Sequence, residues 1–311
     1  MLLNDIRSYN FATFRSDFLA GLTVAIILIP QGMAYSLLAG LHPVYGLYTA
    51  IIPMLIYPIF STSPKLSVGP VALMSIIVLS GVSLFAEPGT QEYLDMVLMV
   101  SFMSGVIQLL FAFFRLGSLS SFLSKPVMKG FISAAGVIIA LSQIKYLMSL
   151  DYERVKSIPQ MIIRIVQNLG TTNFYSMMIG LGGLFLIILL KKIHKAIPAS
   201  IIAVILGSLI LYFFNLTDYK VPIVGELPAG LPSISVSYFH WDYLVTLFPT
   251  AFVISIICFI GSFSLASTFA MKDPQSKKVS PNRELLSLGF AKVVSSFFNG
   301  FPSTGSFSRT A

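Results

Sequence analysis

The chain has 311 residues, of which 56% are apolar and only 10% are charged, and its mean hydropathy is +0.86. A soluble domain carries about 25% charged residues. The composition therefore excludes water as the main solvent and predicts an all-α polytopic membrane protein. The formal net charge of +8 would suit a nucleic-acid partner, but the distribution of the charges described below argues against one. The single cysteine, Cys258, excludes an intrachain disulfide.

Apolar runs about 20 residues long predict the membrane spans. In chain order we place them at 17–39, 43–60, 68–86, 94–114, 127–149, 174–191, 196–215, 242–271 and 284–300. A tenth span begins near residue 304 and is cut off by the end of the chain, and segment 118–126 is predicted to be a short linker.

The charged residues predict the orientation of these spans. If the N-terminus lies in the cytoplasm, most basic residues fall on the inner side: Arg7, Arg15, Lys65, Arg115, Lys125, Lys129, Lys191, Lys192, Lys195, Lys272, Lys277, Lys278 and Arg283. Most acidic residues fall on the outer side: Glu87, Glu92, Asp95, Asp151, Glu153, Asp218, Glu226 and Asp242. This bias follows the positive-inside rule, so the basic charge indicates topology in a cell membrane rather than nucleic-acid binding.

The first span contains Pro30-Gln31-Gly32 at its centre. Proline removes a backbone donor and glycine loosens a helix, so the triplet predicts a broken helix near the middle of the membrane. Such a break is tolerated where it is buried in protein or lines a polar cavity. A plain proline kink is the alternative, although the amide of Gln31 also requires a cavity or a partner.

The third span opens with an extended stretch, Lys65–Val68, followed by Gly69 and Pro70. The apolar stretch from Val71 to Phe85 has about 15 residues, which is too short to cross a bilayer as a helix. The pattern predicts a short strand followed by a half-helix whose N-terminus lies near the midplane. Its free N–H groups and dipole would attract an anion there. The alternative is an ordinary helix that begins at the membrane interface.

The end of the chain, Phe301–Ala311, repeats this pattern with Gly305 and a run of small residues. Arg309 would add a fixed positive charge, which inside a membrane is rare and usually functional; alternatively it lies at the interface. Two half-helices in corresponding positions are the best sequence indicator of a binding site in an inverted-repeat transporter. Spans 3 and 10 are seven apart, so the predicted architecture is seven plus seven spans.

None of the 12 Asp and Glu residues falls at the centre of a predicted span, and the three histidines lie in connections or at span ends. Metal sites and acid/base enzymes need clusters of such groups. We therefore expect no catalytic residue, no metal and no cofactor, and a membrane enzyme or a scaffold remains only as a minor alternative.

Several segments resemble the SulP family of anion transporters, which corresponds to solute carrier family 26. They are Asp17–Ala25, Pro30–Tyr35, Pro43–Tyr48, Ser67–Pro70 and Gly305–Thr310. The resemblance implies fourteen spans in two inverted repeats. A core of spans 1–4 and 8–11 moves against a gate of spans 5–7 and 12–14, and members usually form dimers and carry a cytoplasmic STAS domain.

On this basis residues 1–116 are expected to form core spans 1–4, and residues 117–240 gate spans 5–7 with an outer loop. Residues 241–311 are expected to form core spans 8–10, the last of them incomplete. The anion is expected between the N-termini of spans 3 and 10. The residues that the resemblance places at this site are Gln31, Tyr35, Val71, Ala72, Phe307, Ser308 and Arg309.

The chain departs from the family in two respects. Members often carry a glutamate in the middle of span 8 that is implicated in cation coupling, whereas Gly261 stands at that position here. Its absence makes proton or sodium symport doubtful. The second departure is length: spans 11–14 and the STAS domain are absent, so the chain is expected to be a fragment that does not transport alone.

The leading interpretation is a secondary transporter that moves sulfate, bicarbonate, chloride or a small carboxylate by alternating access. An uncoupled, channel-like anion conductor of the same fold is the first alternative, which Gly261 favours. A nucleobase permease shares the seven-plus-seven architecture, but such proteins usually carry acids near the site. The substrate is beyond the sequence, because backbone amides and one cation bind many small anions.

Overall fold

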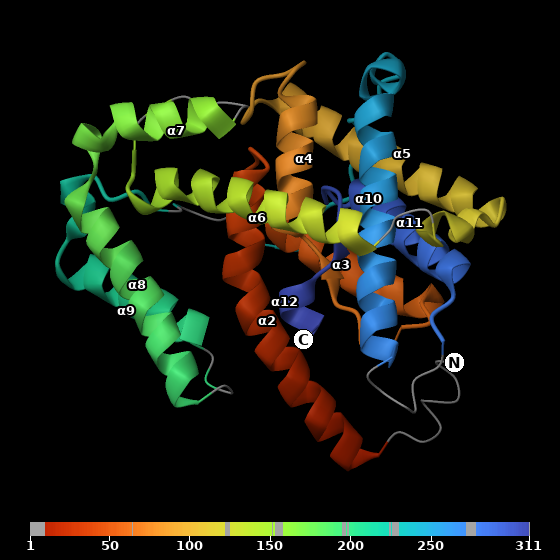
Figure 1. Cartoon of the computed structure of the whole chain (residues 1–311), viewed down its shortest axis with the longest axis horizontal. Helices are drawn as coiled ribbons and strands as arrows, with labels where there is room; N and C mark the ends of the chain where they lie inside the picture. The colour runs from red at the N-terminus through yellow and green to blue at the C-terminus, as the bar shows by residue number, and fades with distance from the viewer. Residues whose placement is uncertain are drawn as a thin grey trace. The chain divides into compact units, whose positions relative to one another are not determined.

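The structure is a computed structural model that describes residues 10–63, 65–121, 125–150, 152, 158–194, 197, 199–223, 225, 230–271 and 278–310. These residues are mostly helical, with two strands of two residues each (Figure 1). Five helices, α2, α3, α5, α8 and α10, are long and apolar enough to cross a membrane. The prediction of an all-α, multi-pass membrane protein is therefore confirmed.

The helices follow the predicted spans to within a few residues. They are α2 (Phe11–Leu38), α3 (Pro43–Phe60), α4 (Ala72–Val82), α5 (Gln91–Phe113), α6 (Lys125–Leu147), α7 (Ile158–Gln167), α8 (Phe174–Ile193), α9 (Ala199–Phe213), α10 (Tyr243–Met271), α11 (Pro281–Phe297) and α12 (Phe307–Thr310). The strands are β1 (Val68–Gly69) and β2 (Thr304–Gly305).

Polar residues in the connections set where the apolar runs become helices. Helix α5 begins after Thr90, whose hydroxyl accepts a hydrogen bond from the Tyr93 amide. Helix α3 begins with Pro43 at its first position, where proline loses no helical hydrogen bond. Start signals of this kind separate α3 and α5 from the apolar segments that precede them.

The predicted break of the first span is wrong, because α2 runs continuously through Pro30. A helix with a proline persists in a membrane when neighbouring helices support it. Gly32 instead allows close packing: a Cβ on Gly46 of α3 would lie 1.9 Å from the Gly32 carbonyl oxygen. Small residues let membrane helices approach at their backbones. The glycine of the Pro-Gln-Gly triplet therefore marks a helix contact rather than an interruption.

Two features between the predicted spans were not anticipated. The predicted linker 118–126 overlaps a 3-10 helix, Leu116–Ser121, while residues 122–124 lie outside the described part. The connection after α6 contains α7, whose apolar residues Ile158, Ile162 and Val166 recur every four positions and are exposed. An amphipathic helix of this kind is typical of a segment that lies in the membrane interface.

The contacts divide the chain into two compact units. Unit 1 comprises residues 1–24, 28–128 and 227–311, and unit 2 comprises residues 25–27 and 129–226. In unit 1, α11 packs along α5 and α3, and α10 packs along α5. In unit 2, α8 and α9 pack side by side (Figure 1).

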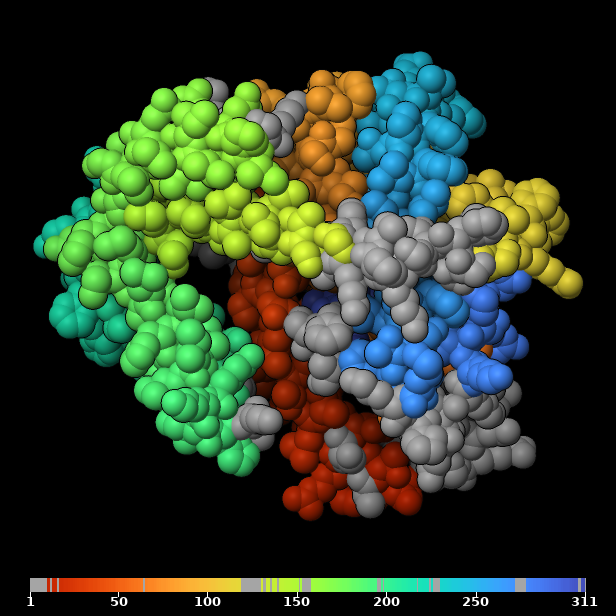
Figure 2. All heavy atoms as spheres, viewed as in Figure 1, coloured from red at the N-terminus to blue at the C-terminus, as the bar shows by residue number. Residues whose placement is uncertain are grey.

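Burial is concentrated in unit 1. Its main core includes Tyr93, Val97, Leu247, Ile254 and Phe301, all of them fully buried. Helix α8, by contrast, buries none of its residues. The first turns of α2 are also exposed, and Figure 2 shows them in red at the surface. Since lipid tails are as apolar as leucine, these exposed surfaces are compatible with the membrane, and close packing rather than hydrophobic burial holds the core together.

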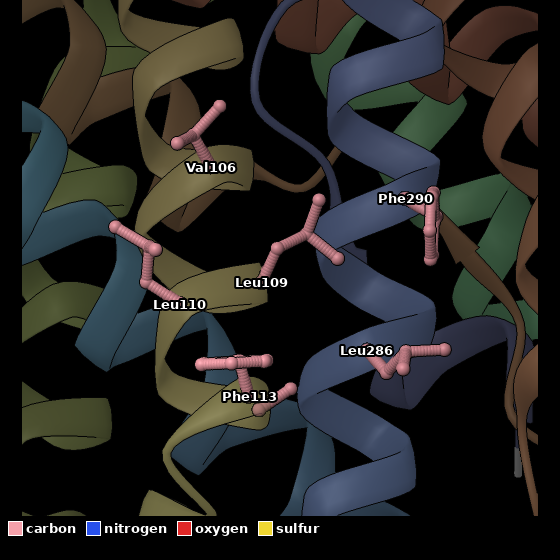
Figure 3. Close-up of a pocket in the computed structure, with 7 residues that line it drawn as sticks. Val106, Leu109, Leu110, Phe113, Leu286 and Phe290 are labelled. Carbon is pink, nitrogen blue, oxygen red and sulfur yellow. The ribbon is translucent and has the colours of Figure 1, made fainter.

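Helices α5 and α11 border an apolar groove of about 400 Å³ (Figure 3). Its lining is entirely hydrophobic: Val106, Leu109, Leu110, Ala112, Phe113, Leu286 and Phe290. It offers no donor or charge to a polar ligand, so the candidate site must lie elsewhere.

Candidate functional site

The two strands join the beginnings of the two predicted half-helices. Strand β1 pairs antiparallel with β2, with Val68 opposite Gly305 and Gly69 opposite Thr304. The Ser306 amide extends the pairing by donating to the Ser67 carbonyl oxygen at 2.9 Å. Segments more than two hundred residues apart in sequence are thus held together, as the predicted strands before spans 3 and 10 require.

Pro70 and Val71 connect β1 to helix α4, which is only 11 residues long, about four fewer than predicted. Val71 is its N-cap and provides no side-chain hydrogen bond, and Ala72 is its first residue. The first N–H groups of a helix lack intrahelical partners, and the helix dipole makes this end positive. Val71 and Ala72 therefore lie at the N-terminus of the half-helix, as predicted from the sequence, and Val71 provides no side-chain cap there.

Arg309 lies against this N-terminus and is only 8% exposed. Its Nη1 donates to the Pro70 carbonyl oxygen at 3.1 Å, and its Nε donates to Ser67 Oγ at 3.4 Å. These bonds attach the guanidinium to the segment that precedes α4. Its Nη2 is buried and has no hydrogen-bond partner in the described part of the chain. Arg309 is therefore oriented by two of its nitrogens and retains a third for another acceptor.

Gly69 makes room for this approach. A Cβ on Gly69 would lie 3.1 Å from Arg309 Nη2, which is tighter than nine in ten Cβ contacts, so the guanidinium would have to move by a few tenths of an ångström. A glycine in a strand often marks the close approach of another group. The glycine predicted to allow a turn thus also makes room for the guanidinium.

Helix α2 contributes Gln31 and Tyr35, which are four residues apart and share one face. Both are half-buried. Tyr35 and Arg309 are close enough to interact electrostatically. The Oε1 of Gln31 is buried and has no partner among the described residues. A Cβ on Gly32 would lie 3.7 Å from Pro70 Cγ, which places this part of α2 beside the start of the third span.

Phe307 and Ser308 are the first residues of α12. Their side chains lie outside the described part of the structure, so only their backbone position agrees with the predicted site. In Figure 2 a small dark blue patch of this C-terminal segment is visible beside α2.

Helix α10 is hydrogen-bonded to β2. Ser262 Oγ lies 2.8 Å from Thr304 Oγ1 and accepts a hydrogen bond from the Gly305 amide at 2.9 Å. Thr304 Oγ1 also donates to the Cys258 carbonyl oxygen at 3.2 Å. Gly261, the position that lacks the family acid, has open space around it, because a Cβ there would meet no atom within 4 Å.

Two buried charged residues were missed by the sequence reasoning. Glu284 is fully buried at the start of α11, where it accepts hydrogen bonds from Tyr57 Oη at 2.5 Å and Ser61 Oγ at 2.9 Å. Lys292 is fully buried in the middle of α11. A lysine inside a predicted span was a sufficient signal, since an ionisable residue within a membrane is a functional candidate by default.

The arrangement provides donors and positive charge but no reactive group. Within the described ranges, no three His, Cys, Asp or Glu side chains come together as a metal site would require. The free guanidinium nitrogen, the uncapped end of α4 and the side chains of α2 all come from unit 1. Chemically, this is a site that can hold a small anion by hydrogen bonds and charge.

Comparison with known proteins shows the family to which the chain belongs. The profile of the Sulfate permease family matches residues 14–311. Sulfate transporter 4.1, chloroplastic, of Arabidopsis thaliana is 34% identical over 98% of this chain and 45% of that protein. The chain spans about half the length of the curated relatives that it matches.

Two solved structures show the same fold. The murine Solute Carrier 26 family member A9 anion transporter in the inward-facing state has a TM-score of 0.89 and 27% identity, over 99% of this chain and 54% of that one. The transmembrane domain of the cyanobacterial bicarbonate transporter BicA has a TM-score of 0.80 and 21% identity, over 97% of this chain and 77% of that one.

Proposed function

Since the chain belongs to the sulfate permease family, we propose that it forms the anion-binding part of a secondary transporter rather than of an enzyme. The full-length protein would move small inorganic or organic anions, such as sulfate, bicarbonate, chloride or a dicarboxylate, by alternating access. It would lie in a cell membrane with its N-terminus in the cytoplasm and act as a homodimer. Relatives of this chain are named as transporters of sulfate, bicarbonate or anions.

The observation that carries this proposal is the buried Nη2 of Arg309, which has no partner in the described residues and lies at an uncapped helix N-terminus. A buried donor without a partner costs about 1–3 kcal/mol, and more when it is charged. A bound anion would remove that cost. Gln31 and Tyr35 would form the polar wall of the site, Val71 and Ala72 would donate from the backbone, and Phe307 and Ser308 would do so from α12.

The two units suggest how the anion would move. Unit 1 contains every described residue of the proposed site, so it would form the core that carries the anion. Unit 2 contains α8 and α9 and would belong to the gate. Binding and transport of the anion would need no covalent chemistry, because the site would only offset part of the free-energy cost of removing water from the anion.

The glycine at position 261 favours a second candidate, an uncoupled or channel-like anion conductor of the same fold. A carboxylate at this position would bind a proton or a cation together with the anion, and glycine provides none. Under this proposal, a pH or sodium gradient alone would not drive anion accumulation.

The test is uptake of labelled anions by the full-length protein in proteoliposomes, with imposed pH and sodium gradients and a fixed voltage. We expect saturable uptake of at least one small anion, and a loss of about 10²–10³-fold in affinity in Arg309→Gln. The upper end of this range corresponds to about 4 kcal/mol, which is the interaction of two charges about 4 Å apart at an effective dielectric constant of about 20. Unchanged affinity of Arg309→Gln for every anion tried would refute the site. Uptake that collapses with a protonophore would refute uncoupled transport.

A further inference from the structure

Lys292 is not one of the residues of the site described above, but it lies close to a residue that contacts the site. It is fully buried in α11, next to Cys258 of α10. The Cys258 thiol donates to the Ser303 carbonyl oxygen at 3.6 Å and lies 3.0 Å from the sulfur of Met74. Ser303 directly precedes β2, and Met74 is in the first turn of α4. Cys258 therefore contacts Lys292 on one side, and on the other side it contacts α4 and the residue before β2.

Among the described residues, no carboxylate lies beside the ammonium group of Lys292. In the described part of the chain, its Nζ makes no hydrogen bond of acceptable geometry, although the Cys258 thiol is close enough to interact electrostatically. Ser295, one turn along α11, and Ser303 also have buried hydroxyls for which the described residues provide no partner. An isolated buried ammonium is costly, and a negative charge nearby, such as a bound anion, would favour the protonated form of Lys292.

The nearest candidate within the same helix cannot supply that charge. Glu284 is eight residues from Lys292, which corresponds to about 12 Å along α11. Its carboxylate is already held by Tyr57 and Ser61. Among the described residues the buried Asp, Glu, Lys and Arg side chains are Glu284, Lys292 and Arg309, so basic side chains outnumber acidic ones in the buried interior.

From this placement we propose that Lys292 is a second positive charge of the anion site, acting through the protein interior rather than by contact, and that it makes the site prefer doubly charged anions. The inference rests on the proposed function and specifies its substrate class. Gly261 is consistent with it, because no carboxylate at that position of α10 offsets the charge of Lys292.

The physical reason for the preference is the scaling of the Coulomb energy with ligand charge. At one position, a dianion interacts with a fixed cation twice as strongly as a monoanion does. The fold-change for a dianion is therefore the square of that for a monoanion. If removal of the charge weakens chloride binding fivefold, sulfate binding at the same position should weaken about 25-fold.

The test uses the full-length protein and measures the affinities for sulfate and for chloride by competition at fixed voltage. Lys292→Met and Lys292→Gln remove the charge and retain much of the side-chain length. Lys278→Met is the matched control, because Lys278 is exposed just before α11. We expect the ratio of sulfate to chloride affinity to fall at least fivefold in both Lys292 variants and to remain unchanged in the control.

An unchanged ratio in folded Lys292 variants would overturn the proposal, even if both affinities fell together, because a purely structural defect affects both anions alike. Failure of both variants to fold would identify Lys292 as a structural residue and would also overturn it. The proposed function fails separately, if the unmodified protein binds neither anion. Binding by the unmodified protein with an unchanged ratio in the variants refutes only the role of Lys292.

Discussion

The attachment of β2 to α10 depends on Ser262, and removal of its hydroxyl gives the most direct structural prediction. In Ser262→Ala the Gly305 amide loses its acceptor and Thr304 Oγ1 loses one of its two partners. A buried donor left unsatisfied costs about 1–3 kcal/mol, and a lost neutral hydrogen bond costs about 0.5–1.5 kcal/mol. The variant should therefore be destabilised by about 1.5–4.5 kcal/mol.

The destabilisation can be measured on the full-length protein in detergent, by denaturant or thermal unfolding with and without a saturating anion. Ser264→Ala is the control, because Ser264 is an exposed serine two residues further along α10. The anion affinity of Ser262→Ala should also fall, since β2 leads directly into α12 and Arg309. A change in stability below about 0.5 kcal/mol, equal to that of the control, would refute this account of how the strand is held.

Three glycine substitutions test other parts of the site. Gly46→Ala should prevent the close contact of α2 with α3, because its Cβ would lie 1.9 Å from the Gly32 carbonyl oxygen. A loss of stability below about 1 kcal/mol, measured by unfolding in detergent, would contradict this. Gly69→Ala should displace the Arg309 guanidinium and weaken anion binding several-fold with a smaller effect on stability, and unchanged affinity would argue against the close approach. Gly261→Glu should fold, since its Cβ has open space, and anion affinity should fall as rising pH ionises the new carboxylate. A pH profile identical to that of the unmodified protein would contradict the placement of this position near the site.

Much of the site could be predicted because its signals are local. The half-helix after Gly69-Pro70 is shorter than a bilayer, and Arg309 is a charge in an apolar context. Both features are visible in a few consecutive residues. Lys292 carried an equally local signal within a predicted span but was overlooked, so this omission reflects the interpretation rather than the sequence.

The break predicted at Pro30-Gln31-Gly32 failed for a different reason. Local propensity correctly identifies proline and glycine as unfavourable inside a helix. It contains no information about Gly46, whose backbone approaches Gly32 and gives the glycine another purpose. Packing against α3 thus explains a Pro-Gln-Gly triplet that local propensity alone interprets as a helix break.

Composition predicts that this chain lies in a membrane, and the order of its residues predicts where most of its helices begin and end and which residues are unusual in a membrane. These properties follow from the preference of each short segment for lipid, water or a helix start. Only the tertiary structure decided that Ser67, Pro70 and Arg309 meet, that Ser262 holds β2, and that one nitrogen of Arg309 is left without a partner. The pairing of β1 with β2 joins segments more than two hundred residues apart, and hydrogen bonds over such a separation depend on the packed fold rather than on local preference.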